Sequence, residues 1–138
     1  MKIDSMRLFR FVSKGMMQIG LVVFLLIHCT SVASADEPDA VAREEIAHLF
    51  SYLGSSGCQF YRNGSWHISA DAVSHLHKKY QHVLKKRRIS TAESFIELVA
   101  TASSTSGKPY LVKCGEAPTV ESAAWFMQEL TRYRAASK

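Results

Sequence analysis

The chain carries its clearest β-hairpin signal in Cys58-Gln59-Phe60-Tyr61-Arg62-Asn63-Gly64-Ser65-Trp66-His67-Ile68. Two short runs that contain aromatic and apolar residues flank Asn63 and Gly64, residue types that tolerate the left-handed backbone conformation of tight turns. The segment therefore predicts a β-hairpin, and we interpret the other segments relative to it.

The length of the hairpin loop can be argued from the side chains. A two-residue Asn-Gly loop would pair Tyr61 with Trp66 and scatter apolar residues over both faces of the sheet. A three-residue loop with Gly64 in a left-handed bulge would instead pair Phe60 with Trp66 and gather the apolar residues on one face. One apolar face is the pattern of a half-buried sheet, so we predict the bulged loop.

Four amphipathic helices and one more strand are predicted around the hairpin. Apolar residues recur at helical spacing in residues 39–53, 69–88 and 90–102 and in a last segment. Residues suited to capping open the later three helices: Ser69, Ser90 as a capping box with Glu93, and Thr119. Residues 110–114 alternate as a short strand. The predicted fold class is α+β, with about four amphipathic helices packed on a small antiparallel sheet of the hairpin plus one strand.

The first 35 residues have the pattern of a cleavable export signal. Four Lys and Arg residues precede the apolar run 20–27, and Ala33 and Ala35 suit a signal peptidase. The run is too short and too interrupted to be a confident spanning helix; an uncleaved anchor is the alternative. We predict a signal peptide over residues 1–35 and a single disulfide-stapled α+β domain over residues 36–138, with no stable membrane span after cleavage.

Two cysteines, Cys58 and Cys114, remain after cleavage, because Cys29 leaves with the signal. Export places the chain where thiols oxidise, and an even pair in a small secreted domain is normally a bridge. The alternative is a pair of reactive thiols. We predict one structural disulfide, which requires the strand at residues 110–114 to lie beside the hairpin.

The charge of the whole chain, +5, overstates that of the exported part. Four of the 17 basic residues and one of the 12 acidic residues lie in the signal, which leaves +2 for residues 36–138. That charge does not favour a nucleic-acid partner. The basic run Lys85-Lys86-Arg87-Arg88 is a candidate contact for an anionic envelope polymer. The alternative is that these cations complement the dipole at the end of the helix 69–88.

The hairpin tip and its surroundings are the best candidate surface for a ligand or partner. Polar side chains on loops or on a helix surface lie between stretches that look structural; they are Arg62, Asn63, Lys79, Ser106 and Lys108. We expect them to converge if the helix 69–88 crosses the sheet near the turn. The alternative is that Asn63 and Gly64 simply supply the turn conformation.

Histidines and serines raise two further possibilities. His75, His77 and His82 are two, five and seven residues apart, whereas helical ligands of one ion stand three or four apart. We interpret them as solvated helix surface and predict no metal and no cofactor. The serines of residues 103–106 beside Lys108 invite comparison with a nucleophile and its basic partner, but no complete catalytic motif surrounds them.

Several short segments run through nearly all of the chain beyond the signal and share one family pattern. They are Glu44-Glu45-Ile46, Ser56-Gly57-Cys58-Gln59-Phe60, Arg62-Asn63-Gly64-Ser65-Trp66, His75-Leu76-His77-Lys78-Lys79-Tyr80, Ser106-Gly107-Lys108-Pro109-Tyr110-Leu111-Val112-Lys113-Cys114, Trp125-Phe126 and Glu129-Leu130. Together they resemble the YfeK-like family of small exported bacterial proteins. The resemblance implies a bacterial envelope setting, a periplasmic location and the pairing of Cys58 with Cys114. It carries no agreed activity.

These observations predict a non-enzymatic periplasmic module that binds an envelope protein or an anionic envelope ligand. The alternative is a small periplasmic hydrolase or other enzyme that uses the Ser, Lys and His groups near the hairpin. The two hypotheses differ in geometry: an enzyme requires Ser106, Lys108 and a histidine in one concave pocket, whereas a binding module does not.

Overall fold

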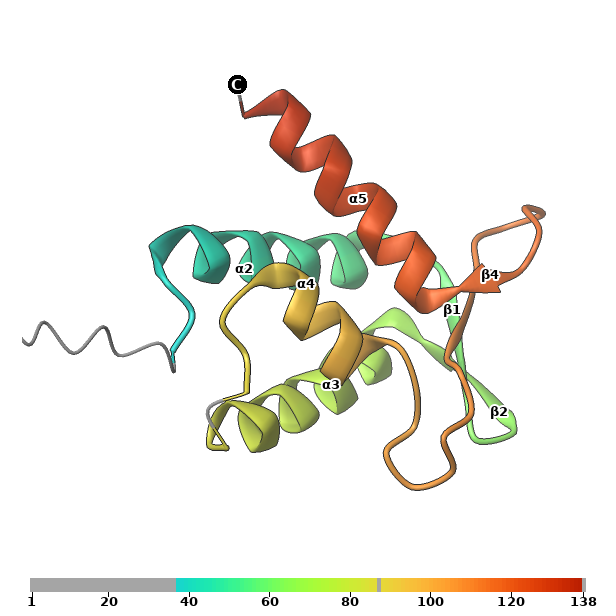
Figure 1. Cartoon of the computed structure of the whole chain (residues 1–138). Helices are drawn as coiled ribbons and strands as arrows, with labels where there is room; N and C mark the ends of the chain where they lie inside the picture. Colours follow the sequence, from blue (N-terminus) through green and yellow to red (C-terminus); the bar gives the residue numbers. More distant parts are fainter. Residues whose placement is uncertain (1–36, 87, 138) are drawn as a thin grey trace, which may run out of the picture. The chain divides into compact units, whose positions relative to one another are not determined.

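Helices and a small sheet alternate along the described part of the chain (Figure 1). The computed structural model describes residues 37–86 and 88–137. The elements are α2 (Ala40–Ser55), β1 (Gln59–Arg62), β2 (Ser65–Ile68), α3 (Ser69–Leu84), α4 (Ala92–Phe95), the π-helical turn η2 (Ile96–Ala100), β3 (Leu111–Lys113), β4 (Val120–Glu121) and α5 (Ser122–Ala136). The predicted signal peptide lies outside the described residues.

The sheet has four antiparallel strands in the order β2-β1-β3-β4. Strand β3 pairs with β1, so the strand predicted at residues 110–114 does lie beside the hairpin. The two-residue strand β4 was not predicted. The α+β fold class is confirmed, with a fourth short strand added to the expected sheet.

The predicted bulged hairpin loop is wrong. Tyr61 lies opposite Trp66 and Arg62 opposite Ser65, which leaves a two-residue loop of Asn63 and Gly64. Their φ angles are 50° and 96°. Positive φ at both loop residues is typical of the type I′ turn, whose twist matches that of the flanking strands. The local preference of Asn-Gly therefore outweighs the gain from gathering the apolar side chains on one face.

The outer face of the hairpin consequently carries exposed apolar side chains. Trp66 is 41% exposed and packs against Tyr61 at a ring-centroid distance of 5.3 Å, and Ile68 is 61% exposed. The alternation of the strands sends Phe60 and its partner His67 to the opposite, inner face. Phe60 is buried there, so the inner face of the hairpin contacts the core and contributes to the pocket described below.

Two predicted helix caps are shifted. Ser69 is the first residue of α3 rather than its cap, and Ile68 takes the N-cap position without a side-chain hydrogen bond. Helix α3 ends at Leu84, four residues before the predicted end at residue 88. The capping box of α4 is formed by Thr91 and Ser94, one residue later than predicted, because the hydroxyl of Ser94 accepts hydrogen bonds from the backbone preceding it.

The last helix begins at Ser122 rather than at Thr119. Before it, Val120 pairs with Val112 of β3 and Glu121 pairs with Leu111, so these residues extend the sheet. Strand pairing therefore competes with helix formation at this point and shortens the helix. Ser122 then follows directly on the edge strand, and its backbone N–H donates to the carbonyl oxygen of Tyr110 at 2.9 Å.

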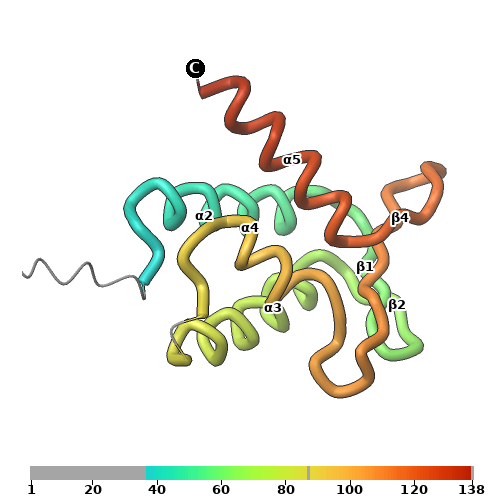
Figure 2. The backbone as a smooth tube through the Cα atoms, viewed as in Figure 1, coloured from blue at the N-terminus to red at the C-terminus, as the bar shows by residue number. Residues whose placement is uncertain are grey.

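The core lies between the helices and the inner face of the sheet. Helix α4 and the turn η2 lie at its centre and contact α2, α3 and α5 (Figure 2). Its largest fully buried apolar side chains are Leu49, Leu53, Ile89, Phe95, Val99, Val112, Phe126 and Leu130. No helix in the described ranges combines the length and the apolar character needed to cross a membrane.

The predicted disulfide is confirmed: Cys58 is bonded to Cys114, with a Cα–Cα distance of 4.3 Å. Cys58 immediately precedes β1 and Cys114 immediately follows β3. The bond therefore joins the neighbouring strands β1 and β3 to each other at the same end of the sheet.

Candidate functional site

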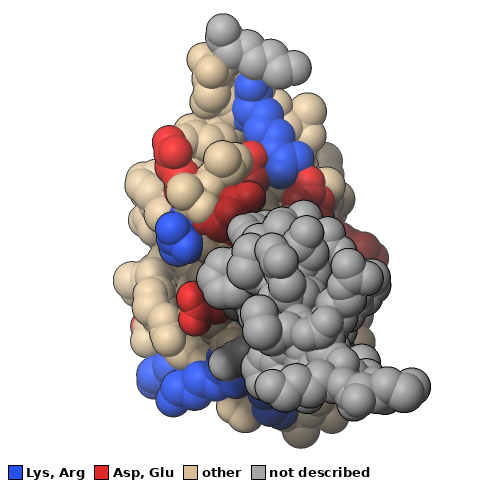
Figure 3. Space-filling model, turned by 60° about the vertical axis from the view of Figure 1, so that its left-hand side comes forward, with Lys and Arg blue, Asp and Glu red and all other residues tan. Residues whose placement is uncertain are grey.

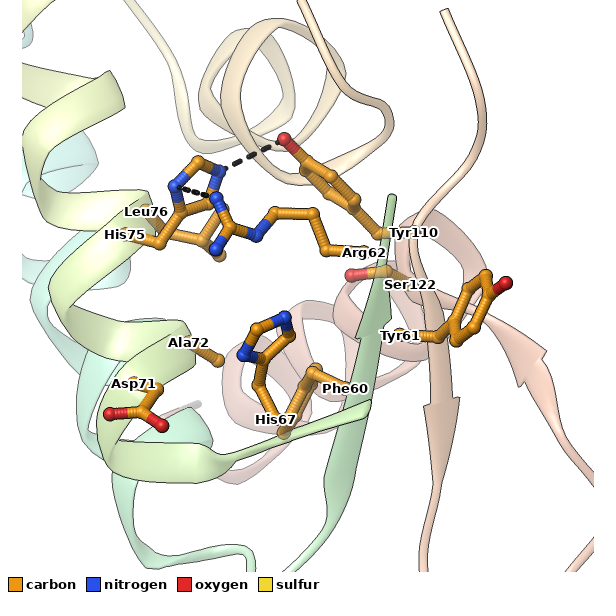
Figure 4. Close-up of a pocket in the computed structure, with 10 residues that line it drawn as sticks. All are labelled: Phe60, Tyr61, Arg62, His67, Asp71, Ala72, His75, Leu76, Tyr110 and Ser122. Atoms are coloured by element: carbon orange, nitrogen blue, oxygen red, sulfur yellow. Dashed lines mark hydrogen bonds between the residues drawn. The ribbon is translucent and has the colours of Figure 1, made fainter. Parts of the chain in front are cut away.

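A pocket lies between the inner face of the hairpin and helix α3 (Figure 4). Its cavity volume is about 30 Å³, and it opens to solvent on one side. The polar residues that line it are Arg62, His67, Asp71, His75, Tyr110 and Ser122. Apolar walls are supplied by Phe60, Ala72 and Leu76.

Local structure explains why these residues meet. Phe60 and Arg62 are two residues apart on β1 and therefore point to the same face of the sheet. On α3, Ala72 and Leu76 are one turn apart, and His75 adjoins them on the face turned toward the hairpin. Tyr110 stands at the start of β3 beside β1. The pocket is thus built where the strand β1 passes the first two turns of α3.

A chain of hydrogen bonds fixes Arg62. One terminal nitrogen of Arg62 (Nη1) lies 2.9 Å from Nδ1 of His75, and Nε2 of His75 lies 3.1 Å from the hydroxyl of Tyr110. A guanidinium can only donate, so Nδ1 of His75 accepts and carries no proton. The proton of the neutral ring is then on Nε2, which donates to Tyr110. His75 thus holds Arg62 on one side and Tyr110 on the other.

The surroundings of His75 favour its neutral form. Burial is the largest cause of its lowered pKa, and the positive charges of Arg62 and Lys79 lower it further. Burial also raises the pKa of Tyr110, although Arg62 acts in the opposite direction. A neutral imidazole and a protonated phenol are the forms that the hydrogen-bond chain requires.

Lys79 lies one turn after His75 on α3 and secures the segment that follows η2. Its ammonium group donates to the carbonyl oxygen of Ala102 at 2.6 Å and lies 5.3 Å from the centre of the Tyr110 ring. Burial lowers the pKa of Lys79. Lys79 therefore packs against Tyr110, which lines the pocket. Its positive charge adds to the positive potential that Arg62 creates there.

The pocket has an excess of positive charge. Asp71 is the only carboxylate among the described residues that line it, and Figure 4 shows it at the end of the pocket away from Arg62. Within residues 37–86 and 88–137, neither Arg62 nor Lys79 takes part in an ion pair. A cation without a carboxylate partner beside an apolar hollow attracts anions more strongly than one in bulk water.

Ser122 is a buried polar group with unused hydrogen-bonding capacity. The residue is 1% exposed, and its hydroxyl has no hydrogen-bond partner in the described part of the chain. No described side-chain nitrogen or oxygen is both sealed off and unpartnered, so this hydroxyl reaches open space. Figure 4 shows it on the side of the pocket between Arg62 and His67. The Ser122 hydroxyl is therefore available to a molecule in the pocket.

The predicted surface residues are brought together in two groups. Arg62 lines the pocket, and Lys79 supports it. Asn63 and Ser106 meet outside it: the hydroxyl of Ser106 donates to Oδ1 of Asn63 at 3.0 Å. The backbone N–H of Lys108 donates to the same hydroxyl at 3.4 Å, and its side chain is exposed. These hydrogen bonds therefore connect the hairpin tip to the loop at residues 103–109, outside the pocket.

The interpretation of all three histidines as solvated surface is wrong for His75, which is half-buried in the pocket. His77 is exposed but contacts the ring of Phe50, and His82 is exposed. Burial could not be assigned to His75 from helical spacing alone, because its partners come from β1 and β3. In the described ranges, no three His, Cys, Asp or Glu side chains gather closely enough to hold a metal ion.

The basic run lies at and beyond the end of α3. Lys85 is the C-cap residue, and Lys86 and Arg88 are exposed. Arg87 is outside the described residues. Figure 3 shows Lys and Arg side chains along its lower edge and again near its top, with acidic side chains between them. None of the described residues of the run, Lys85, Lys86 and Arg88, lines the pocket, so the two candidate anion sites can be tested by different substitutions.

The pocket does not contain the groups that the enzyme hypothesis needs. Ser106 and Lys108 do not line it, and the described contacts of Ser106 are with Asn63 and neighbouring backbone groups. The histidines in the pocket therefore have neither of these residues as a neighbour there.

Comparisons with known proteins agree with the YfeK-like resemblance. A family model described as "Family of unknown function (DUF5329)" matches residues 40–134. The chain is 52% identical over 51 residues to "Uncharacterized protein YfeK" of Salmonella typhimurium (strain LT2). That match covers 37% of this chain and 41% of the relative, so it spans less than half the length of either protein. No solved structure matches the chain.

Proposed function

Because this chain belongs to the DUF5329 family, a family of unknown function, we propose its function from its own pocket. The protein is a non-enzymatic binding module of the bacterial cell envelope. It binds an anionic group of its ligand through the guanidinium of Arg62. The observation that carries this proposal is the position of Arg62, whose guanidinium is held by neutral His75 at a hollow that has a single, distant carboxylate.

Arg62 has hydrogen-bond donors that His75 does not engage and that an anion can therefore use. One terminal nitrogen is engaged by His75, and Figure 4 shows the second on the side of the pocket that contains Ala72 and His67. A guanidinium offers its N–H groups in a fixed plane that matches the oxygens of an anion. Because the hydrogen bond with His75 already restrains the Arg62 side chain, less conformational entropy is lost when an anion binds.

The periplasmic location is proposed from the signal pattern, and the disulfide supports it because such bonds persist in oxidising compartments. We expect cell fractionation to recover the protein in the periplasm with the intact mass of residues 36–138. A mass that includes residues 1–35, in the membrane fraction, would instead indicate an uncleaved anchor.

We expect Arg62→Gln to weaken anion binding at least tenfold, since hydrogen bonds to charged groups are worth about 1.5–3 kcal/mol. The measurement is an NMR titration of the exported protein with sodium acetate and with inorganic phosphate at low ionic strength, where screening is small. Wild type should bind at least one of the two with shifts at Arg62, His75 and Tyr110. The matched control is Arg88→Gln, which removes an exposed cation of the basic run.

Two outcomes contradict the proposal. One is that neither anion binds in a manner that depends on Arg62. The other is that Arg88→Gln weakens binding while Arg62→Gln does not, which would assign the anion to the basic run Lys85-Lys86-Arg87-Arg88 instead. Circular dichroism of both variants establishes that the fold is retained.

A further inference from the structure

We propose that the pocket selects a carboxylate on a short apolar stem, bound by Arg62 and the hydroxyl of Ser122. This inference rests on the proposed function and names its ligand class. Ser122 acts as a specificity-determining residue: it donates to one carboxylate oxygen while Arg62 donates to the other. The stem lies against Phe60, Ala72 and Leu76.

The number of donors favours a carboxylate over a phosphate group. Arg62 has part of its guanidinium engaged by His75, and Lys79 is turned to the carbonyl of Ala102. The donors that remain at the Arg62 end of the pocket are the free side of Arg62 and the Ser122 hydroxyl, whereas His67 lines the pocket nearer Asp71. Two donors match the two oxygens of a carboxylate, whereas a phosphate has more charge and more oxygens to satisfy.

Ser122 supplies an independent indication that the pocket binds a ligand. Ser122 is 1% exposed, yet its hydroxyl is not sealed off, because no sealed-off side-chain oxygen or nitrogen among residues 37–86 and 88–137 lacks a partner. The small exposed part of Ser122 lies on the pocket that it lines. It comes from the first turn of α5, outside the elements that supply the other donors. An acceptor in the pocket would satisfy it.

The walls and the size of the pocket set the length of the stem. Phe60, Ala72 and Leu76 are buried apolar residues that form the apolar part of the lining, beside the polar residues His67 and Asp71. The cavity volume is only about 30 Å³ and its mouth is open, so only a small group can be enclosed there. A carboxylate whose short stem extends toward the open mouth fits this description. Both a short fatty acid and the C-terminal alanine of a peptide present this chemistry.

The test is a titration series on the exported protein by NMR, with acetate, propionate, butyrate, N-acetylalanine, methyl phosphate and inorganic phosphate. For wild type we expect affinity to rise from acetate to butyrate by up to about fourfold per methylene, and both phosphates to bind more weakly than butyrate. Comparison of butyrate with N-acetylalanine distinguishes a fatty acid from a peptide terminus as the source of the carboxylate.

We expect Ser122→Ala to weaken butyrate binding at least tenfold, the range for a hydrogen bond to a charged group. Its melting temperature should equal that of wild type, because the hydroxyl faces the pocket and the substitution leaves no buried polar group unsatisfied. Ser74→Ala, on the exposed side of α3, is the matched control and should change neither quantity.

The inference is overturned if Ser122→Ala leaves butyrate affinity unchanged, or if it lowers the melting temperature, which would make the hydroxyl structural. Binding of phosphates in preference to carboxylates, with continued dependence on Arg62, also overturns it while the proposed function stands. Loss of every Arg62-dependent interaction overturns both.

Discussion

Removal of the disulfide by Cys58→Ala with Cys114→Ala should lower the free energy of unfolding by about 4 kcal/mol. The bond joins residues 56 positions apart, and closure of a loop of that length restricts the unfolded chain by roughly this amount on the chain-entropy account. Both cysteines also pack against the core, so their removal adds a small loss of apolar contact. Urea denaturation of wild type and the double variant measures the difference.

The reduced wild-type protein provides the control for this prediction. A reductant should bring its urea midpoint close to that of the double variant and should leave the double variant itself unchanged. Equal midpoints for oxidised and reduced wild type would contradict the prediction. Because a domain of this size has a modest reserve of stability, we expect the reduced form to be partly unfolded at 37 °C.

Arg134→Leu should lower the free energy of unfolding by about 2 kcal/mol at neutral pH. Nε and Nη2 of Arg134 donate to the two carboxylate oxygens of Glu45 at 2.6 and 2.8 Å, and Nη1 donates to Glu93 at 2.5 Å. Glu45 is 6% exposed, so the substitution leaves a buried charge without its partner. Breaking a fully buried pair costs about 3–5 kcal/mol; the side chain of Arg134 is 44% exposed, so we expect less.

The same network has a pH dependence of known sign. The hydrogen bond from Arg134 is the largest cause of the lowered pKa of Glu93. A carboxyl group whose pKa is lower in the folded state stabilises the fold above its ordinary pKa, near 4.5. This contribution is lost as the pH falls through the lowered value. The difference in stability between wild type and Arg134→Leu should therefore shrink below about pH 4.5.

Two further variants test whether the buried carboxylate causes the effect. Glu45→Gln combined with Arg134→Leu should recover part of the lost stability, because it removes the charge that Arg134 neutralised. Arg88→Leu is the matched control, as Arg88 is exposed and has no ion pair with a described residue. If Arg134→Leu and Arg88→Leu change stability equally, the pair with Glu45 has no net stabilising role.

Most of the architecture could be predicted from local patterns. Helical spacing of apolar residues located all four helices, and the cysteine count with the export pattern identified the disulfide. The disulfide then required residues 110–114 to lie beside the hairpin, as they do. These features depend on periodicity, on compartment or on a single covalent constraint, all of which can be recognised along the chain.

The hairpin register shows where pattern reasoning failed. We assumed that Trp66 and Ile68 must share a buried face with Phe60. The turn preference of Asn63-Gly64 instead sets the pairing, and the two apolar residues on β2 remain exposed on the outer face. A rule that holds for average strands does not outweigh a turn whose two residues both favour positive φ.

The candidate site was predicted in part. Arg62 and Lys79 were named because they lie near the hairpin tip, and both contribute to the pocket or its wall. His75 was assigned to the surface, and Tyr110 and Ser122 were not considered as site residues. Their roles come from contacts between β1, α3 and the start of α5, which depend on the tertiary arrangement. A hydroxyl that faces a pocket, as that of Ser122 does, cannot be recognised before the structure is known.

The disulfide also closes a covalent ring that runs from Cys58 to Cys114 and contains Arg62, His75 and Tyr110. The exposed loop at residues 104–109 lies inside this ring. A protease that cuts the backbone in that loop leaves the two fragments joined by the sulfur atoms, with the hydrogen-bonded chain from Arg62 to Tyr110 still on one covalent body. Helices α2 and α5 lie outside the ring, and their packing against each other depends on noncovalent contacts such as the pair of Glu45 with Arg134.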